Sequence, residues 1–429
     1  MSILNKFAEK KEFLNNLFFN IYCLLMSALF IFRALPYFDQ PGDQTWFAEE
    51  AIRTNYDYLG FAIDRYFTWS SRLLIESATM YFSVHQVRFR IAVFLALFVF
   101  WKCLVSLFLE DGDKHNKIRF LVPLIFILIF TGNFYSGAGL IPNMVNYFFP
   151  MVCFTFGWTL MKKNSKFYNV LSIFFIIFSC MQEQFTILTF LIFLYLLINH
   201  FLKKNKINLK YVCFVLISLL GIISAMISPG NKDRVITEIE VYYPTFDSIS
   251  VFNKVYNGFM EANRVLFLNN TELNFLFLLL ILLLIISIIR KKYGISILVS
   301  VVIFCTLFNK IGIDTPMNTI QKIINDYPDL QLFSKDYYLA LYPVILYALF
   351  LLIIGFSLLT IFDDVETGLF SLILVMSGYL ARMAVSFSPG VFVSGIRTFE
   401  PLIFTSFIVI ILMINELSAL YEKNLEGNE

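Results

Sequence analysis

Charged residues are scarce in this chain. Asp, Glu, Lys and Arg make up 15% of its 429 residues, whereas a soluble globular chain carries about 25%. The mean hydropathy is +0.74. The net charge of +2 shows no basic excess, and we expect no nucleic-acid partner. The shortage of charge excludes an ordinary soluble domain and points to a chain that lies in a membrane.

Cysteine and histidine are also few, and the familiar catalytic motifs are missing. The six cysteines lie inside apolar runs, which argues against a disulfide framework or a cysteine metal site, and the three histidines are scattered. The sequence holds no P-loop, no dinucleotide-binding glycine motif, no HExxH and no GxSxG. We therefore expect neither a metal nor a cofactor.

Long apolar runs recur along the whole chain. They are continuous rather than alternating, which predicts helices and not the strands of a barrel, and a span needs roughly 17–25 residues. The fold class we expect is all-α, a polytopic transmembrane bundle of about 11–13 spans, some of them short. The predicted spans are 17–37, 89–109, 120–133, 146–161, 167–180, 184–201, 211–228, 272–290, 295–308, 338–362, 368–387 and 401–416.

Basic clusters indicate the orientation of these spans. Lysine and arginine favour cytoplasmic loops, and five basic clusters fall on one side when both termini are cytoplasmic. One loop departs from the pattern, because Asp363, Asp364 and Glu366 would lie on that same side. The sequence therefore predicts a multi-pass cell-membrane protein that interacts with the lipid bilayer.

The outer loops hold most of the remaining charges. We treat 1–429 as a single membrane-embedded domain, with a first outer loop over 38–88 that carries interfacial helices and further outer loops over 229–271 and 309–337. Such loops suit a site on the outer face of the membrane. They equally suit solvated connectors.

Two carboxylates follow the first span, in the sequence FDQPGD. Asp39 or Asp43 can accept a proton from an acceptor hydroxyl, although an aspartate before a helix is also a common N-cap. Farther along the loop, one face of Trp69–Phe82 is apolar and suits the membrane interface. Arg72 lies in this stretch and can bind a phosphate, or extend to lipid headgroups.

Two similar Ser-Pro-Gly elements each bring arginine to the outer surface. The first, SPGNKDR, carries Lys232 and Arg234, and the second, SPGVFVSGIR, carries Arg397. These residues are candidates for phosphate or sugar binding, or they mark ordinary helix ends.

Charges within or beside the predicted spans are also candidates, because they are costly there. Arg382 lies in the outer half of a span. Glu183 lies in the turn MQEQ and is either a relay or binding group, or a plain turn residue.

The chain resembles the multi-span glycosyltransferases of the GT-C type, and within them the bacterial GtrII-like and DUF6056-like membrane proteins. The resemblance rests on short sequences spread over most of the chain, namely FDQPGD, WSSR, GAGLIPNMVNYFFP, MQEQ and SPGNKDR. Many of these relatives carry a tighter acidic pair after the first span, whereas Gln40, Pro41 and Gly42 separate Asp39 from Asp43 here, which leaves open which of the two matches the base.

The resemblance implies sugar transfer on the extracytoplasmic face, from a polyprenyl-phosphate sugar donor to a glycan or other envelope-polymer acceptor. It implies a carboxylate base at Asp43 or Asp39, with Arg72, Arg234 and Arg397 in phosphate or sugar recognition. A transporter or flippase of lipid-linked glycans, a glycan polymerase or ligase, and an assembly scaffold remain as alternatives. Alanine at both aspartates would abolish transfer and leave a flippase or scaffold largely intact.

Overall fold

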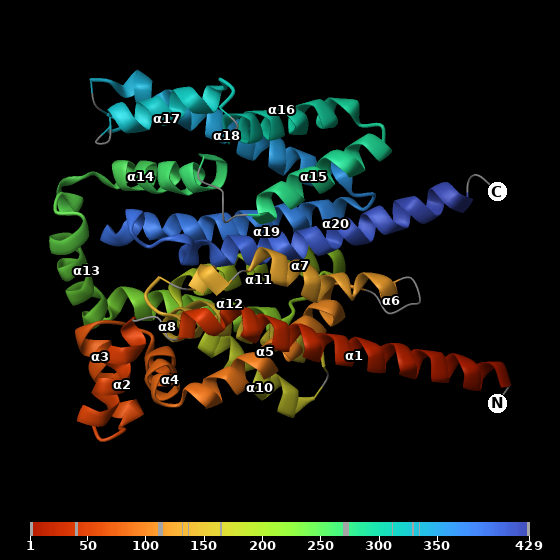
Figure 1. Ribbon diagram of the computed structural model, residues 1–429, viewed down its shortest axis with the longest axis horizontal. Helices are drawn as coiled ribbons and strands as arrows, with labels where there is room; N and C mark the ends of the chain where they lie inside the picture. The colour runs from red at the N-terminus through yellow and green to blue at the C-terminus, as the bar shows by residue number, and fades with distance from the viewer. Residues whose placement is uncertain are drawn as a thin grey trace. The chain divides into compact units, whose positions relative to one another are not determined.

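The fold consists of helices joined by short loops (Figure 1). The structure, a computed structural model, describes residues 3–38, 42–109, 115–130, 132–135, 137–163, 165–268, 274–310, 312–327, 330–333 and 335–426. No β-strand occurs within these ranges, so the all-α prediction is confirmed. The α-helices are α1 (Ile3–Phe38), α2 (Asp43–Arg53), α3 (Tyr58–Thr68), α4 (Leu73–Val84), α5 (Gln86–Phe108), α6 (His115–Ile118), α7 (Leu121–Ile129), α8 (Leu140–Asn143), α9 (Phe149–Met161), α10 (Lys166–Ser179), α11 (Glu183–Lys204), α12 (Leu209–Ile227), α13 (Pro229–Tyr242), α14 (Val251–Asn263), α15 (Asn274–Ile289), α16 (Tyr293–Lys310), α17 (Pro316–Asp326), α18 (Tyr337–Ile361), α19 (Val365–Met383) and α20 (Glu400–Glu426).

Eight helical segments in the described ranges are long and apolar enough to cross a membrane. They are Glu12–Phe38, Gln86–Phe108, Leu140–Met161, Glu183–Lys204, Leu209–Ile227, Tyr337–Ile361, Val365–Phe387 and Ile396–Lys423. The other four predicted spans correspond to shorter apolar helices, α7, α10, α15 and α16. The predicted number of about 11–13 spans therefore stays a prediction.

The long helices expose apolar side chains that water would solvate poorly. On α12, Leu216, Leu220 and Met226 are 54%, 65% and 72% exposed. Apolar surface in water costs roughly 25 cal/mol per Å², and large exposed apolar patches mark contacts with a membrane or a partner. This surface and the eight long helices support the expectation of a membrane protein.

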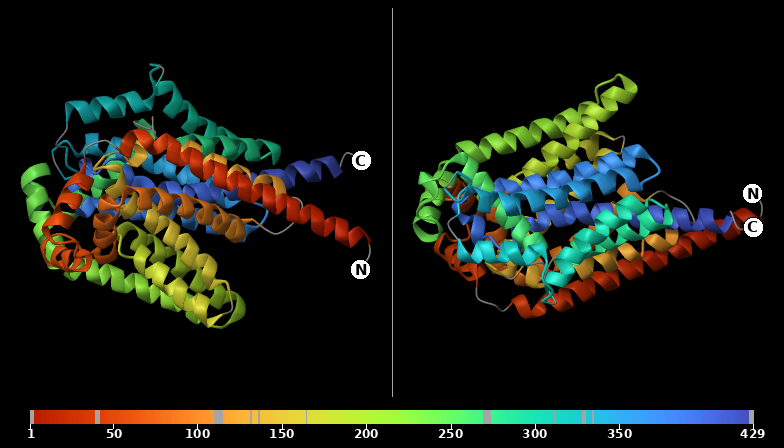
Figure 2. Two further views of the ribbon diagram at one scale, coloured as in Figure 1. Left: turned by 60° about the horizontal axis from the view of Figure 1, so that its bottom comes forward. Right: turned by 90° about the horizontal axis from the view of Figure 1, so that it is seen from above.

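The chain forms two compact units, and each is described by itself. Unit 1 comprises Met1–Phe67, Ser71–Thr186 and Cys213–Ser224. In it α1 packs on α5 and α7, α5 packs on α9, and α9 packs on α10. The short helices α2, α3 and α4 lie beyond the long helices, at the end away from the start of α1 (Figures 1 and 2). They share a small core of Phe47, Ala51, Phe61 and Met80.

Unit 2 comprises Thr68–Ser70, Ile187–Val212 and Ala225–Glu429. In it α19 packs on α18 and α20, and α15 packs on α16 and α20. Helices α19 and α20 approach closely at Gly378 of α19, where an added Cβ would lie 2.6 Å from Leu402 Cα of α20. Helix α13 lies at the end of this unit away from the C-terminal end of α20 (Figures 1 and 2).

The acidic loop that departs from the predicted charge pattern pairs with basic residues of unit 2. Asp363 accepts hydrogen bonds from Arg290 Nη1 at 2.6 Å and from Lys423 Nζ at 2.9 Å. Glu366 pairs with Lys203. The ends of α11, α15 and α20 therefore lie beside the α18–α19 loop, as they must if all four belong to one side of a membrane.

Candidate functional site

The acidic turn after the first span is packed against the glycine-rich sequence before α8. Asp43 is the first residue of α2, and its backbone N–H donates to Ala138 O at 2.9 Å. The N-cap position belongs to Gly42, which has no side chain to act as a cap. Asp43 is exposed in the first turn of α2, where a negative charge interacts favourably with the helix dipole. Asp39, the other predicted base, lies outside the described residues.

Two glycines allow this contact. A Cβ built on Gly42 would lie 2.7 Å from Gly139 Cα and 2.9 Å from Ala138 O, which are both backbone atoms. Gly139 has φ of 104°, a value that side chains disfavour. The adjacent Gln44 is 5% exposed and donates from Nε2 to Phe38 O at 3.3 Å. The turn that carries Asp43 is therefore held in place by its backbone contact with Ala138 and Gly139 and by the hydrogen bond of the Gln44 side chain.

Arg72 and Glu183 form the central ion pair of unit 1. Arg72 precedes α4 and Glu183 begins α11. Arg72 Nη2 donates to Glu183 Oε2 at 2.6 Å, and Arg72 Nε donates to both carboxylate oxygens, to Oε2 at 2.9 Å and to Oε1 at 3.2 Å. This two-point geometry is the one in which guanidinium groups bind carboxylates and phosphates. The sequence marked both residues as candidates, and the structure brings them together although 111 positions separate them.

Asn146 is a further partner of Arg72. Its Oδ1 accepts a hydrogen bond from Arg72 Nη1 at 2.8 Å, and its Nδ2 donates to Pro142 O at 2.8 Å. Asn146 belongs to a π-helical segment, η2 (Met144–Phe148), between α8 and α9. π-helical turns are rare and often occur at functional sites. The side chain of Asn146 thereby orients the guanidinium from the side opposite Glu183.

The turn between α10 and α11 presents Glu183. Gln182 is 1% exposed, and its Oε1 accepts a hydrogen bond from the backbone N–H of Phe185 at 2.9 Å, which caps the start of α11. Met181 Sδ accepts from the backbone N–H of Leu74 at 3.2 Å. The first turn of α4 is thus in direct contact with the turn that precedes α11, beside the ion pair.

A second ion pair lies one turn along α4. Glu76 Oε2 accepts a hydrogen bond from Arg65 Nε at 3.3 Å, and the guanidinium of Arg65 lies 5.2 Å from the Trp46 ring centroid.

The pKa of the Arg72 guanidinium reflects two opposing effects. Burial by itself would lower this pKa, but the charge of Glu183, helped by Tyr147 and Glu76, raises it above its ordinary value. Arg72 is therefore a permanent cation.

The two Ser-Pro-Gly elements meet within unit 2. Ser228 and Pro229 start α13, while Ser388 and Pro389 start the short 3₁₀ helix η7 (Pro389–Phe392). Ser388 Oγ donates to Glu238 Oε2 at 3.1 Å. Arg234 Nε lies 3.7 Å from Glu238 Oε1, which is an ion pair too long for a hydrogen bond. Exposed Lys232 also lies on α13.

The other two predicted arginines of unit 2 have separate surroundings. Arg382 is 1% exposed, and its guanidinium lies 4.6 Å from the Phe399 ring centroid, a cation–π contact. Arg397 is half-buried, and its Nε donates to Ser394 O at 3.0 Å. These contacts hold both guanidinium groups against neighbouring residues of unit 2.

Sequence reasoning missed Asn146 and Glu76. Asn146 lies in the GAGLIPNMVNYFFP stretch, but no local pattern distinguishes it, because its role arises from the π-helical turn and the distant Arg72. Glu76 carried a readable signal, since a carboxylate four residues after Arg72 lies on the same side of a helix.

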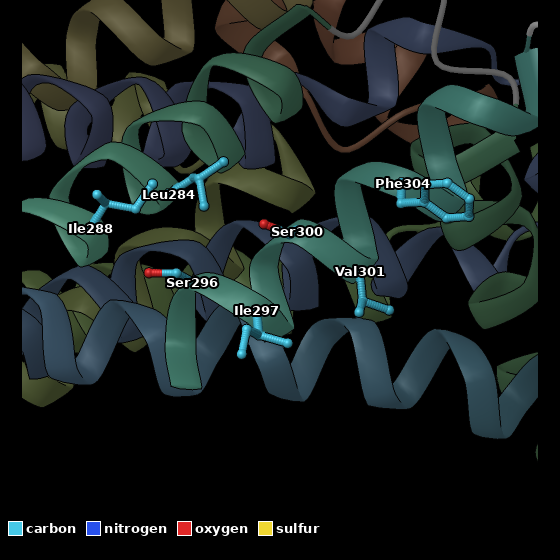
Figure 3. Close-up of a pocket in the computed structure, with 7 residues that line it drawn as sticks. All are labelled: Leu284, Ile288, Ser296, Ile297, Ser300, Val301 and Phe304. Atoms are coloured by element: carbon cyan, nitrogen blue, oxygen red, sulfur yellow. The ribbon is translucent and has the colours of Figure 1, made fainter. Parts of the chain in front are cut away.

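Two other features do not bear on chemistry. A groove between α15 and α16 contains no charged side chain (Figure 3); it is lined by Leu284, Ile288, Ser296, Ile297, Ser300, Val301 and Phe304. Within the described part of the chain, no group of three or more His, Cys, Asp and Glu side chains is arranged to hold a metal ion.

No protein-family model, no curated protein and no solved structure matches the chain.

Proposed function

We propose that the chain transfers a sugar from a polyprenyl-phosphate-linked donor to a cell-envelope glycan or polymer on the outer face of the membrane. One observation supports this function above the others: of the five short sequences that suggested a GT-C-type glycosyltransferase, four are joined by hydrogen bonds in unit 1 although they are far apart in the chain. Asp43 contacts Ala138, and Arg72 bonds to both Asn146 and Glu183.

The proposed reaction uses a base on one reactant and positive charge on the other. The carboxylate of Asp43, or of Asp39, takes the proton of an acceptor hydroxyl. The hydroxyl oxygen then forms a bond to the anomeric carbon, the bond from that carbon to the phosphate oxygen breaks, and polyprenyl phosphate leaves with the electron pair. Cationic groups near the leaving phosphate stabilise the charge that develops there. The bonds and charges of this reaction balance without a metal or a cofactor.

Arg72 is the cation of unit 1 that we assign to the phosphate, with Glu183 as its partner. For Arg234, Lys232, Arg397 and Arg382, the proposed role in phosphate or sugar recognition rests on the sequence. We further propose that both termini are cytoplasmic and that Asp43 and Arg72 lie on the extracytoplasmic side. Partly exposed Arg72 can then reach a lipid phosphate at the membrane surface.

The test is release of polyprenyl phosphate by the purified protein in liposomes, with a panel of synthetic polyprenyl-phosphate sugars and glycan acceptors. Asp43→Asn and Asp39→Asn are compared with Glu49→Gln, which removes an exposed carboxylate from the same helix as Asp43. We expect one aspartate variant to lose at least about 100-fold in rate, the usual scale for a general base, and Glu49→Gln to retain the wild-type rate. Transport or scaffolding would be favoured instead if the folded wild type consumed no donor and both aspartate variants still supported envelope synthesis in cells.

A further inference from the structure

The ion pair of Arg72 has the geometry of an anion site that is already filled. Arg72 presents Nε and Nη2 to a single carboxylate, that of Glu183, at 2.9 and 2.6 Å. The same edge of a guanidinium binds a phosphate through two parallel hydrogen bonds. A phosphate can therefore reach this edge only if Glu183 moves away.

The surroundings favour an anion at this position, whichever anion it is. Helices α4, of 12 residues, and α11, of 22 residues, both begin beside the pair, and each helix N-terminus carries about half a positive charge. Several N–H groups of these first turns already have partners, among them Leu74 N–H with Met181 Sδ and Phe185 N–H with Gln182 Oε1, so the helix ends act here through their dipoles. Together with the guanidinium, the two helix ends provide more positive charge than one carboxylate balances.

Glu183 is also placed to leave. The side chains of Arg72 and Glu183 are 17% and 26% exposed, whereas the neighbouring Glu76 is 8% exposed and paired with Arg65. Asn146 binds Arg72 through Nη1, away from the edge that Glu183 occupies. If the carboxylate of Glu183 swung outward, Asn146 would still hold the guanidinium in position.

We propose that the phosphate monoester of a polyprenyl lipid binds the Nε–Nη2 edge of Arg72 by displacing the Glu183 carboxylate. The choice of this ligand rests on the function proposed above. Glu183 is then a positioning residue, which keeps Arg72 oriented while the site holds no lipid and competes with the incoming phosphate. A phosphate monoester carries a charge of up to about −2 near neutral pH, so it can outcompete a carboxylate of charge −1.

The experiment measures binding rather than transfer. The full-length protein is placed in phosphatidylcholine nanodiscs and titrated with a short polyprenyl monophosphate, with inorganic phosphate and with the matching polyprenol. The variants are Glu183→Gln, Arg72→Lys, Arg72→Gln and the control Glu76→Gln. Glu76 is a second carboxylate beside Arg72, and it is bonded to Arg65. The thermal unfolding midpoint of each variant shows which ones are folded.

We expect Glu183→Gln to bind the polyprenyl monophosphate about tenfold more tightly than the wild type, because no charged hydrogen bonds must be broken first. Glu76→Gln removes the same charge and should change the affinity less than about threefold. Arg72→Lys keeps the charge but loses the two-point edge, and we expect it to bind about tenfold more weakly. Binding of the polyprenol should be the same in all folded variants.

Equal tightening by Glu183→Gln and Glu76→Gln would overturn the proposal, since it would reduce the effect to general electrostatics. So would unchanged or weaker binding by folded Glu183→Gln. Equal affinity for inorganic phosphate and for the polyprenyl monophosphate would show that the ligand of this site is free phosphate and not the lipid. If the binding pattern is as expected but no sugar is transferred, the phosphate site stands and the transferase function falls. If transfer depends on Asp43 but Glu183→Gln leaves the lipid affinity unchanged, the transferase function stands and the displacement of Glu183 by phosphate is refuted.

Discussion

A methyl group added at Gly42 should separate the acidic turn from the sequence before α8. The Cβ of Gly42→Ala would lie 2.7 Å from Gly139 Cα and 2.9 Å from Ala138 O. Neither atom can rotate aside, because both belong to the backbone. The φ of Gly42 is −175°, an extended value open to any residue, so the cost arises from crowding alone.

The size of the effect follows from that crowding. Methyl groups forced into packed positions cost about 1–3 kcal/mol, and the clash is with backbone, so we expect the upper half of that range. The hydrogen bond from Asp43 N to Ala138 O, 2.9 Å long, should lengthen or break as the two segments part. Transfer activity should therefore fall more than the loss of folded protein explains, because Asp43 moves with its turn.

The measurement is the thermal unfolding midpoint in nanodiscs, together with the transfer rate per folded molecule. Gly294→Ala is the matched control, because a Cβ at Gly294 meets no atom within 4 Å. In the first turn of α16 the alanine should leave stability unchanged or raise it by up to about 1 kcal/mol. A Gly42→Ala protein as stable and as active as Gly294→Ala would refute the close contact of the two segments.

Three further predictions concern stability. Arg72→Gln and Glu183→Gln should each destabilise the protein by about 1–3 kcal/mol, less than the 3–5 kcal/mol of a fully buried pair, and the double variant should lose less than the sum of the two in a double-mutant cycle. The bond from Lys423, with help from Arg290, holds the pKa of Asp363 below its usual value. Its stabilisation is therefore present above about pH 4 and lost as the pH falls through the lowered pKa; Asp363→Asn should lower the unfolding midpoint slightly at pH 7, and the difference from wild type should shrink as the pH falls below about 4. Gly378→Ala should cost several kcal/mol, since its Cβ would lie 2.6 Å from the backbone of α20, and chemical denaturation would detect this.

The helices could be predicted from the sequence because a long continuous apolar run indicates a helix without any knowledge of distant contacts. The predicted spans 89–109 and 338–362 correspond to helices Gln86–Phe108 and Tyr337–Ile361. The predicted run 120–133 became a helix of nine residues, Leu121–Ile129, since hydropathy measures apolar character and does not fix where a helix stops. The helical first outer loop was also expected, but the apolar face of Trp69–Phe82 packs partly inside unit 1, where Phe82 contacts Phe149.

Contacts between distant segments were not readable. The acidic loop with Asp363 and Glu366 seemed to contradict the charge pattern, and only the folded chain shows that these carboxylates pair with basic residues from the ends of other helices. Charge counts along a sequence treat each loop alone. The acidic loop is an exception when it is considered alone, but in the folded chain it is part of a cluster of paired opposite charges.

The same limit applies to the arginines, which the sequence presented as equivalent candidates for phosphate. In the structure Arg72 is bound by Glu183 and Asn146, whereas the ion pair of Arg234 with Glu238, among the residues that the structure describes, is 3.7 Å long. A phosphate must compete for Arg72, and it meets far less competition at Arg234. Residue type and position therefore predict which side chains can bind an anion, but the partners already in place determine the free energy that binding must overcome. For Arg72 that competition resides in one carboxylate, Glu183, and substitution of this single group separates the intrinsic affinity of the guanidinium from the cost of freeing it.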